Sequence, residues 1–141
     1  MEEKESQARA LLDKTNRQFN ECNALYHAAA QRCGLSDAAF WTLYALVTSC
    51  EPLTQNHIAA DWGIPKQTLN SAVAAMVKKG LLALCPEKGA HSGKIVTLTA
   101  EGRALAERTV VPVIAAEEMY RLTQRHLECL QREFETISAF P

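Results

Sequence analysis

The chain has 141 residues, of which 48% are hydrophobic and 22% are charged, and its formal net charge is −1 at pH 7. This is the composition of an ordinary globular protein with enough apolar side chains for a core. No apolar run approaches the length of about 18 residues that a membrane span needs. The polar and charged start, MEEKESQ, is unlike a signal peptide, so we expect a cytoplasmic protein with no membrane partner.

The cysteines and histidines give no sign of a metal site. The five cysteines lack the paired spacing of metal ligands, and their odd number argues against a disulfide scaffold or a zinc finger. No two of the four histidines show ligand spacing. No nucleophile–base motif, phosphate loop or carboxylate pair stands out, which makes an enzyme the least favoured class. We therefore predict no metal and no other cofactor.

Residues 6–33 are predicted to form one long helix that ends at Gly34. Apolar and small side chains recur there at alternating spacings of three and four, which produces a heptad-like seam. The seam consists of Leu12, Thr15, Phe19, Cys22, Tyr26, Ala29 and Cys33, and is widened by Leu11 and Leu25. Another helix, from this chain or from a partner, must cover such a seam.

Two shorter helices are predicted next. Residues 37–49 follow Ser36, which is a good N-cap residue, and Thr54 can cap a further helix. Gly63 ends that helix, because glycine tolerates the left-handed conformation of a C-terminal turn. The apolar residues expected to face inward from the second of these helices are Ile58, Ala59 and Trp62.

A fourth helix is predicted between Pro65 and Gly80. Proline suits a first helical turn, where its missing N–H is no loss. The inward residues are Leu69, Val73, Met76 and Val77, and the residues pointing outward from the first turns are Lys66, Gln67, Thr68, Asn70 and Ser71. This helix and the preceding one have the layout of a helix-turn-helix, in which the second helix enters a DNA major groove.

A hairpin follows, with predicted strands at 81–85 and 94–98 and an exposed loop at 86–93. It would convert the helix-turn-helix into a winged helix. The predicted fold is therefore mainly α-helical with a small two-stranded β wing. Residues 64–103 contain six Lys or Arg and two Asp or Glu, a net charge of +4, so the remainder carries −5. A basic patch on an acidic body attracts phosphate at one face.

The last third of the chain is again helical. Thr99 is expected to cap a helix that runs to about Tyr120, with a kink at Pro112, which lacks the N–H needed for a backbone hydrogen bond to Arg108. Thr123 is expected to cap the last helix. The apolar seam of that helix consists of Leu127, Leu130, Phe134 and Ile137.

The first and last helices each carry an apolar stripe without a mate in the centre of the chain. Packing them together across a two-fold axis would bury both stripes, which predicts a homodimer. Three parts are therefore expected: an N-terminal dimerisation helix at 1–33, a winged helix-turn-helix DNA-binding domain at 34–103 and C-terminal dimerisation helices at 104–141.

Four segments carry a resemblance to the MarR (multiple-antibiotic-resistance regulator) family of bacterial transcription factors. They are LTQ at 53–55, GIPKQT at 63–68, VKKGLL at 77–82 and LTAEGR at 98–103. The resemblance covers residues 35–105 closely and the rest in outline, and it implies dimerisation through the terminal helices. MarR-like wings usually carry an Asp and Arg pair near the tip, where this chain has EKGAHSGK, and Ser71 stands where the family often has arginine. Both departures predict weaker or more salt-sensitive DNA binding.

DNA contacts are predicted for residues of the helix-turn-helix and the wing. Gln and Asn can pair with adenine, hydroxyls reach bases or phosphates, and lysines contact phosphate without specifying sequence. The alternative for the polar residues is a solvated helix face. The predicted contact residues are Thr54, Gln55, Lys66, Gln67, Thr68, Asn70, Ser71, Lys78, Lys88, His91 and Lys94.

Two further features suggest control by a signal. Tyr26, Trp41, Tyr44 and Trp62 could line a pocket for a small apolar or aromatic effector, although most aromatic residues of small domains belong to the core. The stretch CNALY, from Cys22 to Tyr26, resembles the sensing segment of the organic-hydroperoxide branch of the family, in which tyrosines hydrogen-bond an oxidisable cysteine. The alternative for Cys22 is a small buried packing residue.

These observations predict a DNA-binding transcriptional regulator. We expect a repressor that binds a pseudo-palindromic operator in double-stranded DNA as a homodimer and is released by a small-molecule effector. One alternative is a redox-sensing regulator that acts through Cys22. The other is a winged-helix protein-interaction module with weak DNA binding, which would not need the basic patch.

Overall fold

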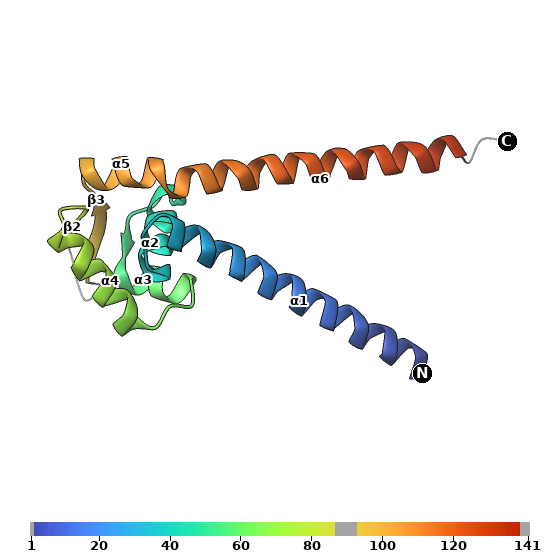
Figure 1. The fold of residues 1–141 in the computed structure, drawn as a ribbon, viewed down its shortest axis with the longest axis horizontal. Helices are drawn as coiled ribbons and strands as arrows, with labels where there is room; N and C mark the ends of the chain where they lie inside the picture. Colours follow the sequence, from blue (N-terminus) through green and yellow to red (C-terminus); the bar gives the residue numbers. More distant parts are fainter. Residues whose placement is uncertain (1, 87–92, 139–141) are drawn as a thin grey trace.

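The computed structural model describes residues 2–86 and 93–138, without the side chains of 120–124, 127, 130 and 133–138. The elements in chain order are α1 (Glu2–Arg32), α2 (Asp37–Thr48), β1 (Leu53–Thr54), α3 (Gln55–Asp61), α4 (Lys66–Lys78), β2 (Leu82–Pro86), β3 (Lys94–Leu98), α5 (Ala100–Arg108) and α6 (Val110–Ser138). The elements from α2 to α5 gather into a head, and α1 and α6 extend from it as two diverging long helices (Figure 1). The predicted mainly α-helical winged-helix fold is confirmed.

The core lies inside the head and is built around α2. Phe40 and Leu43 of α2 are fully buried, and they meet buried side chains from α3, α4 and the sheet. The other fully buried large apolar residues are Ile58, Leu69, Val73, Val96 and Val110. The inward residues predicted for α4 are confirmed, with Val77 only partly buried. The prediction for Trp62 is wrong, because this residue is the C-cap of α3 and is 37% exposed.

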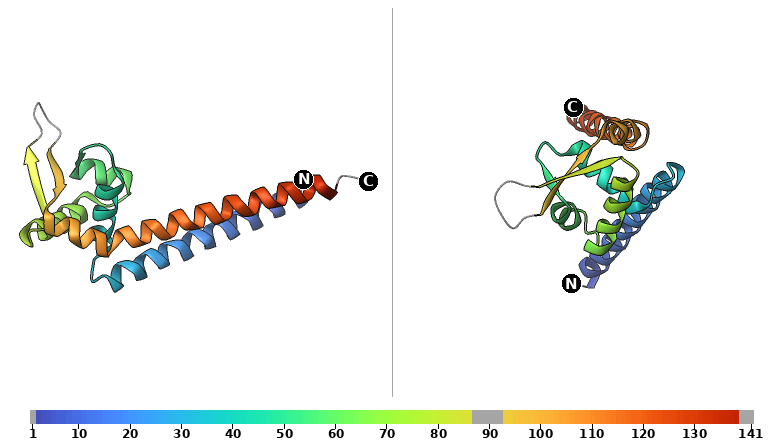
Figure 2. Two further views of the ribbon diagram at one scale, coloured as in Figure 1. Left: turned by 90° about the horizontal axis from the view of Figure 1, so that it is seen from above. Right: turned by 90° about the vertical axis from the view of Figure 1, so that its left-hand side faces the viewer.

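The sheet has three strands in the order β1-β3-β2, one more than the predicted two-stranded wing. β2 and β3 pair antiparallel from Leu82↔Leu98 to Pro86↔Lys94, and β1 joins the other side of β3 through Leu53↔Val96. β1 anchors the base of the wing beside α3. The β2–β3 hairpin lies at the end of the molecule opposite the two termini (Figure 2).

Side-chain caps and glycine turns set the helix boundaries of the head as predicted. The hydroxyls of Ser36, Thr54 and Thr99 each accept a hydrogen bond from the backbone N–H three residues later, at 3.2, 3.3 and 3.0 Å. Gly63 has a φ of 61° in the turn between α3 and α4. Pro65 occupies the N-cap position of α4, just before the first turn rather than within it.

A close approach of backbones fixes the start of α5 against the start of the wing. The Thr99 hydroxyl donates to the Gly80 carbonyl oxygen at 2.6 Å. The backbone N–H of Thr99 donates to the Leu81 carbonyl oxygen at 3.1 Å. A Cβ atom added to Gly102 would lie 1.8 Å from the Leu81 carbonyl oxygen. Only glycine therefore fits at residue 102 in this backbone arrangement. Its small size lets α5 pack directly against the start of the hairpin.

The C-terminal helices differ from the prediction in two respects. The break falls at Thr109, one turn before Pro112, so that the proline lies in the first turn of α6, where its missing N–H is no loss. No kink at Pro112 is needed for that reason. α6 then continues without interruption to Ser138, so the prediction that Thr123 begins a new helix is wrong.

The two long helices leave their apolar residues uncovered within the chain. α1 starts at Glu2, earlier than predicted, and Ala30 is its buried residue. Phe19 and Leu25 of the predicted seam are 70% and 72% exposed, and Leu11 and Leu12 are exposed as well. The side chains of the second seam, Leu127, Leu130, Phe134 and Ile137, lie outside the described residues. Within the described part of the chain, no helix has the length and apolar character to cross a membrane.

Candidate functional site

The N-terminal half of α4 presents one polar face to solvent. Leu69 and Val73 are buried against α2 and α3, which turns the intervening side chains outward. The exposed residues on this face are Lys66, Gln67, Thr68, Asn70 and Ser71, as the sequence predicted. Five side chains with donors or acceptors are therefore available on a helix at the end of the molecule opposite the termini (Figures 1 and 2).

The other predicted contact residues divide into three groups. Lys78 at the end of α4 and Lys94 at the start of β3 are exposed, and Gln55 is partly buried at the start of α3. Lys88 and His91 lie outside the described residues. Thr54 is 3% exposed and its hydroxyl is used as the cap of α3, so its side chain is not available to a nucleic acid and this prediction is wrong.

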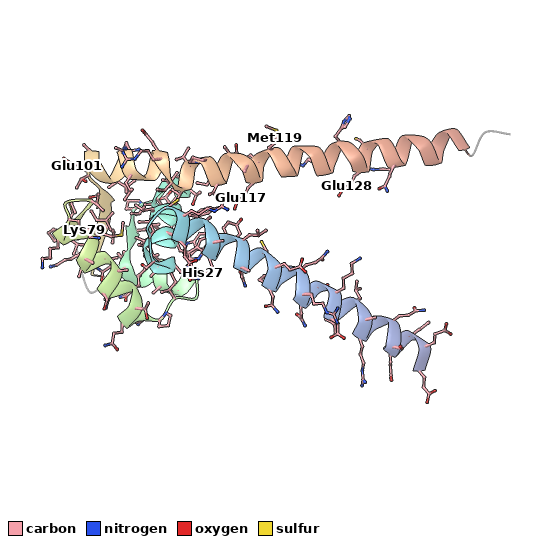
Figure 3. All side chains as sticks on the ribbon, viewed as in Figure 1. His27, Lys79, Glu101, Glu117, Met119 and Glu128 are labelled. Atoms are coloured by element: carbon pink, nitrogen blue, oxygen red, sulfur yellow. The ribbon has the colours of Figure 1, made fainter. Side chains whose placement is uncertain are left out.

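Lys79 adds a cation that the predicted contact set did not include. It is exposed at the C-cap of α4, next to Lys78. Figure 3 shows it on the head, away from Glu117 and Glu128 of the long α6 helix. The paired lysines in the sequence VKKGLL were the signal for this residue. Positive side chains therefore stand on α4 and, with Lys94, at the loop end of the β2–β3 hairpin, where they can contact phosphate.

The four predicted effector-pocket residues come together where α1, α2 and α3 meet. Trp41 and Trp62 stack with ring centroids 5.0 Å apart and planes at 20°. Tyr26 lies against Trp41 at 4.9 Å, and Tyr44 lies against Trp62 at 5.2 Å. Phe40 supports the group from the core side. The aromatic residues thus form one continuous cluster, which joins the head to α1.

Glu117 of α6 is the polar centre of this region, and sequence reasoning missed it. The hydroxyls of Tyr26 and Tyr44 donate to its two carboxylate oxygens, the Tyr44 bond at 2.6 Å. One side chain therefore connects α1, α2 and α6. Figure 3 shows Glu117 on the side of α6 that faces α1. Val113, Ala116 and Glu117 have helical spacing, but nothing in the sequence relates that stripe to the two tyrosines.

Two cavities flank the aromatic cluster. The first, of about 490 Å³, lies between α1, α2 and α6, and we call it the carboxylate pocket. The second, of about 510 Å³, lies between α1, α2 and the end of α3, and we call it the tryptophan pocket. Both volumes are in the range of small-molecule sites. The carboxylate pocket is lined by Cys22, Leu25, Tyr26, Ala29, Tyr44, Val113, Ala116 and Glu117. The tryptophan pocket is lined by Phe19, Cys22, Asn23, Tyr26, Trp41, Asp61 and Trp62.

Cys22 lines both pockets, and its surroundings differ from both interpretations of the sequence. The thiol is free and the residue is exposed, so within this chain it is not a buried packing residue. The two tyrosines of this region, Tyr26 and Tyr44, donate their hydroxyls to Glu117. All five cysteines are free, and no group of three potential metal ligands occurs among the described residues.

A polar contact near the pockets joins the end of α1 to the start of α2. Nδ1 of His27 lies 2.8 Å from both carboxylate oxygens of Asp37, and both side chains are about half exposed. Sequence periodicity placed His27 one residue away from the seam and did not indicate a partner. The contact spans the turn at Gly34, which connects α1 to α2.

Comparison with known proteins agrees with this architecture. The MarR family model matches residues 34–91, and no curated protein matches the chain. A MarR family regulator from Neisseria meningitidis is 25% identical, with a TM-score of 0.56 over 91% of this chain and 96% of that one. The M. tuberculosis transcriptional regulator MosR in complex with DNA is also 25% identical, with a TM-score of 0.51 over 87% and 95%.

A MarR from Staphylococcus aureus, in complex with salicylate and kanamycin, shares the fold at 14% identity. Its TM-score is 0.62, over 95% of this chain and 94% of that one. These structures therefore match the long helices as well as the head, whereas the family model matches only the part of the head from α2 to β2. The matched residues include the helix-turn-helix and the first strand of the wing, so residues 34–91 of this chain are similar to the MarR family of transcriptional regulators.

Proposed function

We propose that this protein is a cytoplasmic repressor that binds a pseudo-palindromic operator as a homodimer and is released by a small-molecule effector. The observation that carries the proposal is the exposed polar face of α4, held outward by the buried Leu69 and Val73. The N-terminal turns of a recognition helix are the part that reaches base edges in the major groove. Lys78, Lys79 and Lys94 supply charges for the phosphates on either side.

The exposed seam of α1 supports the homodimer. Large apolar side chains are rarely left in a continuous exposed row on a monomer, and a second copy of α1 and α6 would cover them. A symmetric dimer places two α4 helices at a fixed separation. Two half-sites one helical turn apart, about 34 Å, would then be read together.

The two pockets support control by a small molecule. They lie between the head and α1 or α6, so an occupant contacts both parts at once. A ligand that prefers one arrangement of head and long helices shifts the population toward that arrangement. The S. aureus MarR structure, which contains salicylate and kanamycin, is a fold relative that binds small molecules.

The test is DNA binding by fluorescence anisotropy, using fragments upstream of the protein's own gene and a random duplex. Asn70→Ala should weaken binding to the specific fragment by about 1–3 kcal/mol and reduce its preference over random DNA. The control is Asn16→Ala, an exposed asparagine on α1 that is far from α4. Equal loss on both duplexes would show that α4 does not read bases, and weak binding to every duplex would favour the protein-interaction module.

Redox control through Cys22 is a second candidate, favoured by the exposure of this thiol at the junction of both pockets. Oxidation would give a sulfenic acid and then a mixed disulfide with a small thiol, adding polar bulk between α1 and the head. Wild-type protein should then lose the specific fragment in organic hydroperoxide, while Cys22→Ser should retain it. If wild-type protein keeps the fragment under mild oxidation, effector release alone remains.

A further inference from the structure

Four of the seven residues that line the tryptophan pocket are aromatic. Phe19 and Tyr26 come from α1, Trp41 comes from α2, and Trp62 caps α3. The stacked Trp41–Trp62 pair and the Tyr26–Trp41 contact hold three of these rings against one another. Ring faces carry the negative part of an aromatic quadrupole, so a pocket walled by several of them attracts cations.

The polar side chains that line the same pocket carry negative charge and no positive charge. Asp61 contributes a carboxylate, and Asn23 contributes a neutral amide. No lysine, arginine or histidine is among the described residues that line the pocket. An anionic ligand would therefore meet a like charge, while a cationic ligand would meet an opposite charge and the ring faces together.

We infer that the tryptophan pocket selects an organic cation with an aromatic or apolar body, such as an amine or a quaternary onium ion. We assign organic cations as the effectors of the proposed repressor. Their regulatory role rests on that proposed function. The pocket joins α1 to Asp61 and Trp62 at the end of α3, the first helix of the helix-turn-helix. An occupant therefore contacts both the long helix and the head, and it biases the angle between them.

The first experiment compares tetraphenylphosphonium with tetraphenylborate, which share four phenyl rings and differ in the sign of their charge. The full chain is titrated in sodium buffer at low ionic strength, and tryptophan fluorescence is recorded. The chain has two tryptophans, and both line this pocket, so the signal reports on the site itself. Tetraphenylphosphonium should bind about tenfold more tightly. Equal affinity, or tighter binding of the borate, would overturn the inference.

Variants locate the bound cation. Asp61→Asn keeps the shape of the side chain and should weaken tetraphenylphosphonium binding about threefold to fivefold. Trp62→Leu should weaken it about tenfold, with Trp41 left as the reporter. The matched control is Glu107→Gln, which removes one negative charge from an exposed position on α5 outside both pockets, and it should bind as wild type does. Circular dichroism melting curves check that each variant is folded.

Two results would contradict this assignment. Wild-type affinity in Asp61→Asn would show that the carboxylate does not select charge, and wild-type affinity in Trp62→Leu would place the cation elsewhere.

A last measurement adds tetraphenylphosphonium to the complex with specific DNA, which should dissociate over the same concentration range. Unchanged DNA binding with a filled pocket would overturn the effector role. Absence of specific DNA binding would instead be a failure of the proposed function, with the charge preference of the free protein still measurable.

Discussion

The head and the two long helices use apolar residues in opposite ways. In the head, Leu43 and its neighbours are fully buried by elements of the same chain, and side-chain caps begin α2, α3 and α5. In α1, Phe19 and Leu25 stand mostly exposed, although they have the same helical periodicity as core residues. The comparison teaches that periodicity identifies an apolar face but not the molecule that covers it. The head buries its apolar residues with its own contacts, whereas the long helices leave large apolar side chains exposed within the chain.

The largest expected effect separates the two regions by stability. Leu43→Ala should lower the free energy of unfolding by about 2–5 kcal/mol, because it leaves a cavity at the centre of the core. Leu25→Ala removes the same atoms from an exposed position and should change the unfolding of the head by less than about 1 kcal/mol. Urea denaturation at low protein concentration, followed by tryptophan fluorescence, measures both. Equal losses would mean that the head and the long helices unfold as one unit.

The head could be predicted closely because its signals are local. Ser36, Thr54 and Thr99 are cap residues adjacent to the helices they begin, and Gly63 and Gly80 adopt positive φ just after α3 and α4 end. The errors arise where the local signal is absent or ambiguous. β1 has two residues, too few to show strand periodicity. The residues around Thr123 are good helix formers, and their propensity outweighs the cap that a threonine offers.

The candidate site could be predicted only in part, because only some of its features have a local signal in the sequence. The exposed face of α4 follows from helical spacing, and the aromatic cluster involves residues that composition alone draws attention to. Glu117 could not be predicted, because its partners Tyr26 and Tyr44 are 91 and 73 residues away in the chain. Trp62 was expected inside because its position fits the apolar face of α3, but as the C-cap it leaves that face. Contacts between distant helices depend on packing that periodicity does not specify.

The second prediction tests whether a partner covers the long helices. Phe19→Asp places a charge in the exposed seam of α1, which should weaken self-association by about 3 kcal/mol, roughly a hundredfold, if a second chain buries that position. Light scattering should give twice 15.6 kDa for the wild type and a smaller average mass for the variant at micromolar concentration. The control is Gln18→Glu, which adds a negative charge at the neighbouring exposed residue outside the seam. A monomeric wild type would remove the basis for reading two half-sites.

A smaller effect tests how firmly the wing is held to the head. Gly102→Ala brings a Cβ atom within 1.8 Å of the Leu81 carbonyl oxygen, and the backbone must move to relieve the clash. We expect a loss of about 1–3 kcal/mol in the free energy of unfolding. The control, Gly63→Ala, has open space around the new atom and the cost of a positive φ alone, about 1 kcal/mol. A variant as stable as the wild type would show that α5 can shift away from the hairpin without cost.

The smallest expected effect concerns the connection between the two regions. Tyr44→Phe removes the hydroxyl that donates to Glu117 at 2.6 Å and leaves the ring in place against Trp62. A partly buried hydrogen bond to a carboxylate contributes about 1 kcal/mol or somewhat more, so the loss in unfolding free energy should be near that value. Because the bond joins α2 in the head to α6, hydrogen exchange should also speed up around Glu117 while the core around Phe40 keeps its protection. Thr15→Val, which removes an exposed hydroxyl from α1 away from the Tyr44–Glu117 bond, is the control for the loss of a hydroxyl. If Tyr44→Phe accelerates exchange equally in the core and around Glu117, the Glu117 carboxylate contributes to the stability of the head itself, and the boundary between the head and the long helices must be moved into α6.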